Sequence, residues 1–132
     1  MSSGWLLPVD ARLVTPETHR QVLDGVTIET MGANPPHALA HTEAAHVFRG
    51  CLAPGFAAAV DMLTRLNAGT DLAPDVSVFP AAPDPVTGRR QLEHITFEVC
   101  DSEDTAHVTD KARRFTARGV RRVFYVQVRQ RT

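Results

Sequence analysis

The clearest pattern in the chain is a period-two alternation over residues 92–99, which predicts a β-strand. In such a strand the side chains of Leu92, His94, Thr96 and Glu98 share one face, and those of Ile95, Phe97 and Val99 share the other. Residues 105–118 then have a helical pattern that ends at Gly119, and residues 120–128 form a last predicted strand. A strand, a crossover helix and a second strand predict a parallel pair with a right-handed connection.

The first half of the chain gives less regular patterns. Thr15-Pro16-Glu17 is typical of a helix N-cap followed by proline, which predicts a short helix through Val22 and Leu23. Residues 26–30 are rich in β-branched side chains and predict a strand. Residues 38–52 place their apolar positions on one helical face.

Three further segments lie between residues 56 and 88. The alanines of residues 56–66 favour a helix, but their alternation favours a strand, and we predict a strand. Residues 67–71 predict a turn, residues 76–79 a strand stopped by Pro80, and residues 83–88 a loop. The whole pattern predicts an α/β fold with a mixed sheet flanked by helices.

Length and composition narrow the class of protein. The 132 residues suit one domain over residues 1–132, and a hydrophobic content of 43% is ordinary for a soluble protein. We expect no membrane-spanning segment and no signal peptide, since no stretch is long and apolar and the first residues lack a charged start. The two cysteines, Cys51 and Cys100, are far apart and form no CxxC pair, so we predict that both are buried free thiols. Free thiols are typical of a reducing compartment, and we therefore expect a cytoplasmic protein.

Charge is unevenly distributed. The net charge is −1, yet eight of the 14 Lys and Arg residues follow Asp110, and no acidic residue does. A basic end of this kind can face phosphates. It can equally be a solvated surface that offsets the acidic remainder.

Two carboxylates are placed where strands begin or end. Glu98 lies near the end of its predicted strand, and Asp75 begins the preceding one after Pro74. Carboxylates that meet at a strand end bind a hard divalent cation such as Mg²⁺ well. Lys111, in the first half of the next helix, could return over this end, where an ammonium would orient a water and offset charge on a phosphate.

These motifs, in their order and spacing, resemble the Uma-two family of putative restriction endonucleases. The resemblance rests on Pro74-Asp75 before a strand, Glu98-Val99, Lys111 on the following helix and Gly119-Val120 at the last strand. Upstream, Asp24-Gly25 and the segment from Asn34-Pro35-Pro36 to His41 are similar to its early turn and its helix start. The resemblance covers roughly residues 20–128.

The resemblance implies a restriction-endonuclease-like core of the PD-(D/E)xK type. It implies that Asp75 and Glu98 hold Mg²⁺ or Mn²⁺, that Lys111 is the catalytic lysine moved onto a helix, and that His41 lies near the site. It also implies a DNA substrate and a homodimer. The chain departs from the pattern at Cys100, where E-x-K would have lysine, and in the acidic link over residues 100–104.

We therefore expect a Mg²⁺-dependent endonuclease that hydrolyses DNA phosphodiester bonds. The residues expected at the DNA backbone are Arg113, Arg114, Arg121 and Arg122. The departures from the family pattern motivate a second hypothesis, a catalytically inactive nuclease-fold domain that binds DNA or a protein partner.

Several other residues have competing interpretations. His37 and His41 are four residues apart and could begin a zinc site, but a third ligand is missing from that face. His94 shares a strand side with Glu98 and could lie near the site, or be a half-buried histidine. We expect turn or edge carboxylates at Asp61 and Asp71, a solvent-facing or ion-paired Glu93, and no thiol nucleophile at Cys100.

Overall fold

The computed structural model describes residues 14–16, 20–28, 35–101 and 105–128. No helix in these segments is long and apolar enough to cross a membrane. The described elements, in chain order, are β1 (Val22–Leu23), β2 (Val26–Thr27), α1 (Pro35–Gly50), β3 (Phe56–Val60), β4 (Thr64–Asn67), β5 (Thr70–Leu72), β6 (Val76–Pro80), β7 (Ile95–Asp101), α2 (Thr105–Arg118) and β8 (Arg122–Val128).

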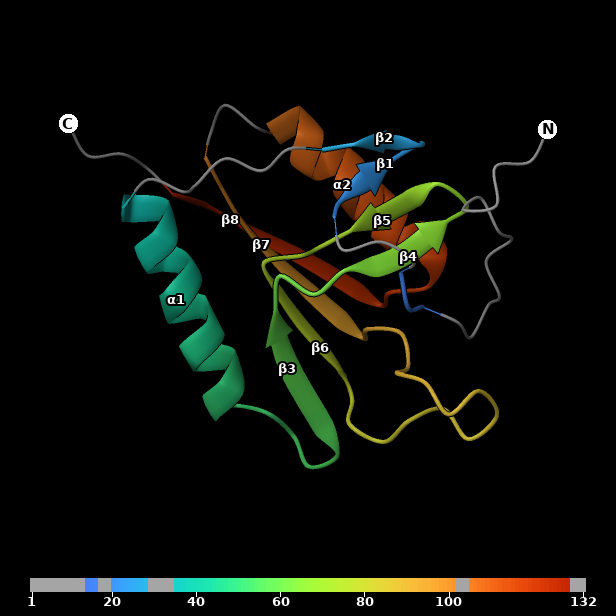
Figure 1. Cartoon of the computed structure of the whole chain (residues 1–132). Helices are drawn as coiled ribbons and strands as arrows, with labels where there is room; N and C mark the ends of the chain where they lie inside the picture. The colour runs from blue at the N-terminus through green and yellow to red at the C-terminus, as the bar shows by residue number, and fades with distance from the viewer. Residues whose placement is uncertain (1–13, 17–19, 29–34, 102–104, 129–132) are drawn as a thin grey trace.

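The strands form two sheets, which confirms the predicted α/β class (Figure 1). The smaller sheet has the order β2-β1-β5-β4 and is antiparallel throughout. The larger sheet has the order β3-β6-β7-β8 and is mixed, because β7 and β8 are parallel while its other pairs are antiparallel. The parallel pair joined by α2 is the unit that the sequence predicts.

The two helices lie on different parts of this framework. Helix α1 runs beside β3, β6 and β7 of the larger sheet, on the left in Figure 1. Its Phe48 ring meets the Phe97 ring of β7 edge to face, with centroids 5.0 Å apart. Helix α2 contacts β7 and β8 of the larger sheet and also β4 of the smaller one. It therefore links the two sheets, while α1 covers only the larger one.

The main buried cluster lies between α2 and the smaller sheet. It is formed by Leu66, Leu72, Phe115 and Val120, with Leu92 packed against it. Helix α2 ends there as the sequence predicts: the Val120 N–H donates to the Phe115 carbonyl at 3.1 Å, and Gly119 has a φ of 121°. A Cβ at Gly119 would lie 3.2 Å from Leu92, so glycine serves both the backbone turn and the packing.

Four predictions about local structure are wrong. Val22 and Leu23 form a strand instead of a helix end, because they pair with β2 and β5. Residues 56–66 form two strands instead of one, separated where Asp61 takes a φ of 51°. Residues 92–94 precede β7 and do not extend it. Cys51 is exposed just after α1, whereas Cys100 is buried as expected. Predictions on residues 29–30 lie outside the described residues.

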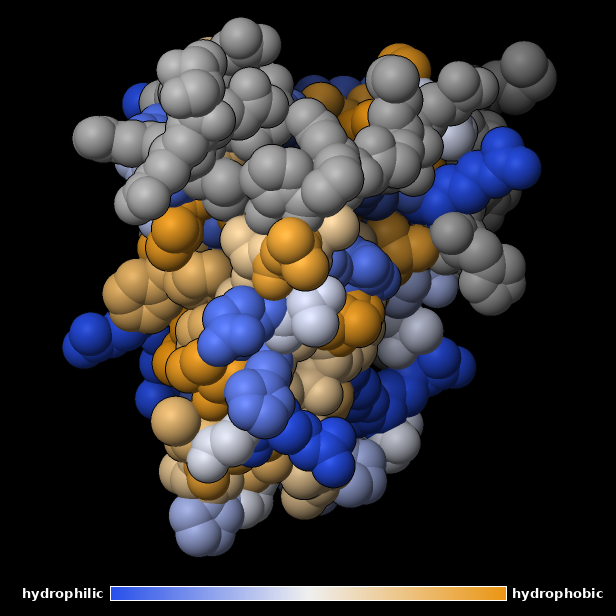
Figure 2. Space-filling model, turned by 90° about the vertical axis from the view of Figure 1, so that its left-hand side faces the viewer, coloured by the Kyte–Doolittle hydropathy of each residue, from blue (hydrophilic) through white to orange (hydrophobic). Residues whose placement is uncertain are grey.

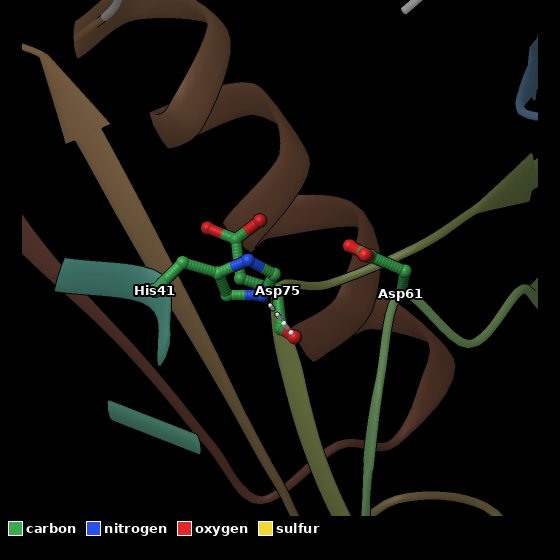
Figure 3. A group of neighbouring side chains, drawn as sticks. All are labelled: His41, Asp61 and Asp75. Carbon is green, nitrogen blue, oxygen red and sulfur yellow. Dashed lines mark hydrogen bonds between the residues drawn. The ribbon is translucent and has the colours of Figure 1, made fainter. Parts of the chain in front are cut away.

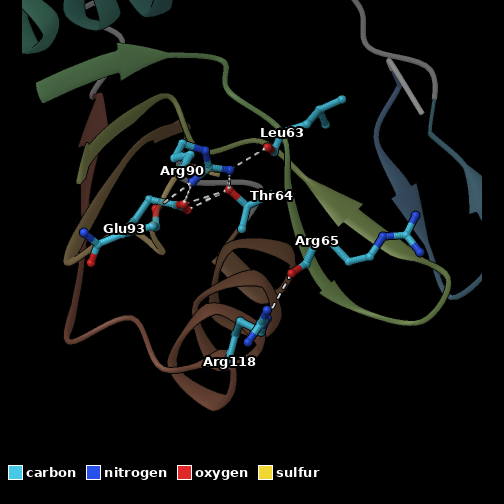
Figure 4. Close-up of polar contacts among 7 residues, drawn as sticks. Leu63, Thr64, Arg65, Arg90, Glu93 and Arg118 are labelled. Carbon is cyan, nitrogen blue, oxygen red and sulfur yellow. Dashed lines mark hydrogen bonds and ion pairs between the residues drawn. The ribbon is translucent and has the colours of Figure 1, made fainter. Parts of the chain in front are cut away.

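Buried polar contacts tie the smaller sheet to the rest (Figure 4). The Glu93 carboxylate, 1% exposed, accepts the Thr64 hydroxyl at 2.8–2.9 Å and forms an ion pair with Arg90. Arg90 also donates to the Leu63 carbonyl, 3.1 Å away. Arg118 Nε donates to the carbonyl of Arg65 at 3.0 Å, so the last turn of α2 is fixed to β4. Glu93 is thus the ion-paired residue that one of its two interpretations predicts.

Two buried hydroxyls on the β6–β7 ladder give a stability prediction. Ser77 and Thr96 are register partners, and within the described residues neither hydroxyl oxygen has a hydrogen-bond partner. Replacing Ser77 with alanine and Thr96 with valine should change the free energy of unfolding by less than about 1 kcal/mol, or raise it, since no bond is lost. Urea unfolding measures this. The matched control is Thr64→Val, which removes one of the two partners of the buried Glu93 carboxylate and should cost about 1–3 kcal/mol. A Thr96→Val loss as large as that control would contradict the prediction.

Candidate active site

Asp75 and Glu98 lie opposite each other on neighbouring strands. Val76 of β6 pairs with Phe97 of β7 in antiparallel register, so the preceding Asp75 is opposite Glu98. Because side chains directly opposite in a ladder share a face, both carboxylates point to the same side of the sheet. Asp75 Oδ2 accepts the Val99 N–H at 2.6 Å, which fixes its carboxylate against β7. Local pairing thus brings together two carboxylates that are 23 residues apart in sequence.

Lys111 reaches this pair from α2. Its Nζ lies 2.6 Å from Glu98 Oε1 and donates to the Ala73 carbonyl at 2.7 Å. The side chain is buried, with 9% of the residue exposed, and Lys111 is the only lysine in the chain. A lysine on a solvated helix face would extend into water. This one instead places an ammonium beside the Glu98 carboxylate, on the strand position opposite Asp75.

Burial raises the pKa of Glu98 to about 7. The Lys111 ammonium pulls the pKa down, and the neighbouring Asp75 carboxylate pushes it up, but loss of hydration is the largest effect. Glu98 is 8% exposed, so water screens it little. An ionised Glu98 is therefore poorly compensated by the protein alone, and a divalent cation at this position would stabilise its charge.

This pKa predicts a pH-dependent stability difference for Glu98→Gln. Between the unfolded pKa of 4.5 and the folded pKa of about 7, the folded state keeps a proton that the unfolded state has lost. The wild type therefore loses stability as the pH rises through this window, and glutamine, which does not titrate, does not. Relative to the variant, the metal-free wild type should lose about 2 kcal/mol between pH 5 and pH 8.

Urea unfolding in EDTA at the two pH values measures this difference. Glu43→Gln, on the exposed surface of α1, is the matched control and should follow the wild type at both. Equal pH dependence of the wild type and Glu98→Gln would show that Glu98 ionises as easily in the folded state as in the unfolded chain.

His41 and Asp61 approach Asp75 from two other elements (Figure 3). One ligand atom from each of the three side chains lies within 4.8 Å of the others. The Asp75 carbonyl accepts the Asp61 N–H at 3.3 Å and lies 2.9 Å from His41 Nε2. A carbonyl can only accept, so Nε2 carries the hydrogen and the Nδ1 of a neutral His41 has a free lone pair.

These donors suit a divalent cation. Carboxylate oxygens are the ligands that Mg²⁺ and Mn²⁺ prefer, and an imidazole nitrogen suits the transition metal better. A histidine whose other ring nitrogen donates to a backbone carbonyl is the usual arrangement of a metal-binding histidine. The residues present therefore fit such an ion, with Asp75 shared between Glu98 on one side and His41 and Asp61 on the other.

Asp61 is the residue of this group that the sequence did not indicate. It follows β3 directly, at a left-handed turn, which agrees with the predicted turn carboxylate. It reaches the site because Val60 pairs with Val76 in register, so the end of β3 meets the start of β6. The sequence shows an aspartate directly after an apolar strand. It does not show that this strand pairs with β6, which is the contact that brings Asp61 to Asp75.

The arginines expected at DNA are distributed differently. Arg114 forms ion pairs with Asp24 and Asp110, at 3.0 and 2.9 Å. The hydrogen bond from Arg114 also lowers the pKa of Asp24. Arg113, Arg121 and Arg122 are exposed, and Arg122 pairs with Ile95, three residues before Glu98 on β7. They flank the site on the α2 side and do not enter it.

The remaining candidates take their expected minor roles or fall outside the described side chains. The ring of His94 packs against Phe56, and burial followed by the charge of Arg121 lowers its pKa. The Cys100 thiol donates weakly to the Val126 carbonyl at 3.6 Å. Asp71 is fully buried in a two-pronged ion pair with Arg65, so its turn assignment is wrong. The side chain of His37 lies outside the described residues.

The fold and this set of carboxylates beside a buried lysine define a restriction-endonuclease-like α/β core. The family model Uma2, described as "Putative restriction endonuclease", matches residues 8–132. The chain belongs to this family, which confirms the resemblance. No curated protein matches the chain, and no solved structure does.

Proposed function

We propose that this protein is a Mg²⁺- or Mn²⁺-dependent endonuclease that hydrolyses phosphodiester bonds in DNA. The observation that carries the proposal is the contact between Lys111 and Glu98, directly opposite Asp75. A buried ion pair between an ammonium and a carboxylate is costly to maintain for stability alone. Family membership adds the class of reaction, nuclease cleavage.

The cation would be held by Asp75 together with either Glu98 on one side or His41 and Asp61 on the other, whose ligand atoms lie within 4.8 Å of one another and of Asp75. When bound, it would supply charge stabilisation at the phosphate and ease the ionisation of a water. The Val99 N–H keeps the Asp75 carboxylate in place for this. The contact between His41 Nε2 and the Asp75 carbonyl fixes the imidazole ring beside Asp75.

Lys111 contributes to hydrolysis through its position. The oxygen of a water forms a new bond to phosphorus, and the bridging P–O bond opposite it breaks. The ammonium orients this water and offsets the negative charge that builds on the phosphate oxygens. The water gives up its proton to a Glu98 carboxylate oxygen, since the Lys111 ammonium cannot accept one, and the leaving oxygen takes a proton from solvent. Glu98 and the Ala73 carbonyl hold Nζ in place throughout.

The test is cleavage of supercoiled plasmid with Mg²⁺, with Mn²⁺ and with EDTA. We expect cleavage with either ion and none in EDTA. Cutting both strands at one position needs two such sites, so we propose a homodimer. Linear product together with a dimer in sedimentation would support it, and nicked circles from a monomer would contradict it. Intact plasmid in all three conditions would remove the catalytic proposal.

A further inference from the structure

A groove opens between α1 and β3 beside the candidate site. It has a volume of about 460 Å³ and is lined on one side by Ala45, His46 and Arg49 of α1. The other side is formed by Ala58, Ala59 and Val60 of β3. Figure 2 views the α1 side of the molecule and shows hydrophilic side chains among hydrophobic ones along its middle. Val76 of β6 completes the lining, and we refer to these seven residues as the α1–β3 groove.

One end of the groove lies next to the candidate site, because its lining residues Val60 and Val76 are the chain neighbours of Asp61 and Asp75. His41, Ala45 and Arg49 are four residues apart along α1, so they form one stripe on the helix. On the opposite side, β3 ends at Val60 and is followed by Asp61. Both walls therefore run from the His41–Asp61 end to Arg49, a distance of about 12 Å along the helix.

The chemistry of the groove suits a phosphate backbone. Arg49 and His46 are its only charged or titratable lining residues, both are exposed, and neither is acidic. Arg49 offers five N–H donors, and a histidine ring offers at least one. The alanines of β3 project only methyl groups, so a chain can approach the sheet closely. Arg49 also lies in the last turn of α1, where a cation is favourable in any protein, so charge at this position is not sufficient by itself.

We propose that the α1–β3 groove holds the backbone of the DNA strand that is cut, with Arg49 and His46 contacting its phosphates. This inference rests on the proposed function, since it takes the reacting phosphate to lie at Asp75. Because the two ends of the groove are about 12 Å apart, Arg49 would contact a phosphate a few nucleotides from the cleaved bond. The strand would enter along α1, on the opposite side from the exposed arginines near α2.

Fluorescence anisotropy with a labelled DNA oligonucleotide, single-stranded and duplex, tests this in EDTA. Wild type, Arg49→Ala and His46→Ala are compared over 0.1–1 M salt, with Arg89→Ala in the exposed loop as the matched control. One lost phosphate contact should reduce the slope of log K against log salt by about 0.9 for a duplex or 0.7 for a single strand. At 0.1 M salt Arg49→Ala should therefore weaken binding up to about eightfold, while Arg89→Ala stays within twofold.

Plasmid cleavage with Mn²⁺, measured in parallel, separates this inference from the proposed function. Arg49-dependent binding without any cleavage supports the groove and removes the catalytic proposal. If DNA is cleaved but Arg49→Ala binds it as tightly as Arg89→Ala does, the groove proposal is overturned. If the slope of log K against log salt falls in Arg113→Ala instead, the DNA lies on the α2 side. The chain could instead self-associate through the groove. If Val60→Asp abolishes self-association and Arg49→Ala leaves DNA binding unchanged, the groove is an interface between copies and the DNA proposal is overturned.

Discussion

Replacing Lys111 with alanine is expected to lower the rate of metal-dependent DNA cleavage by a factor of about 10²–10⁴. The ammonium lies 2.6 Å from Glu98 Oε1, and no other cation among the described residues forms an ion pair with Glu98. Lys111 is also the only lysine in the chain, and no second lysine can substitute from a neighbouring turn. Because the side chain is buried, truncation leaves a space and leaves the Glu98 carboxylate without its ion-pair partner.

The measurement is single-turnover cleavage of a labelled duplex with Mn²⁺, for wild type, Lys111→Ala and Lys111→Arg. Arginine keeps the charge but has a wider, planar head group, so it should recover only a small part of the rate. Arg113→Ala, two residues along the same helix with an exposed side chain, is the matched control and should keep more than a tenth of the rate. Equal rates for wild type and Lys111→Ala would remove Lys111 from the mechanism.

The fold of Lys111→Ala must be checked, since a buried ion pair is lost. Lys111 is the only lysine, and the only other primary amine is the α-amino group at the chain start. The rate at which a small amine-reactive reagent modifies Lys111 is therefore an independent measurement on the wild type. If Lys111 lies against a bound cation and DNA, the two together should slow its modification. Unchanged labelling with and without these ligands would contradict the placement of Lys111 at the reacting phosphate.

Asp75→Asn is expected to lower cleavage on the order of 10³-fold, about 4 kcal/mol, by removing the shared charge at the candidate cation site. Asparagine retains an oxygen that can accept the Val99 N–H, so the β6–β7 register should survive. The Asp75 carboxylate contacts the Glu98 side chain. One of its oxygens also lies within 4.8 Å of a ligand atom of His41 and of Asp61. Its neutralisation therefore weakens both halves of the donor set.

Calorimetric titration with Mn²⁺ measures the effect without depending on catalysis. Asp75→Asn should raise Kd at least tenfold, and Asp84→Asn, a carboxylate in the loop after β6 that accepts the Val86 N–H, is the control. Comparing Glu98→Gln with Asp61→Asn shows which side of Asp75 holds the ion. Unchanged Mn²⁺ affinity in all three site variants would mean that these residues bind no cation.

The sequence by itself determined the elements whose signals are local. The alternation before Glu98, the helical pattern over residues 105–118 and the glycine at 119 predict β7, α2 and the parallel strand β8. Local periodicity is reliable there because one face of each element must be buried, and burial leaves a repeating pattern. The strand pattern indicated only Glu98 in this way, and the family resemblance supplied Asp75 and selected Lys111.

Only the tertiary structure decided which segments pair. A two-residue strand such as β1 has no periodicity, and its partner β5 is almost 50 residues away, so the smaller sheet could not be predicted. The same holds for Asp61, which reaches Asp75 because β3 pairs with β6, and for Arg49, which faces β3 because α1 packs there. Long-range pairing depends on the shapes and volumes of whole faces, which no short stretch of residues records. Asp75 was recognisable from the sequence, but its neighbours on the α1 side became visible only once the sheet was assembled.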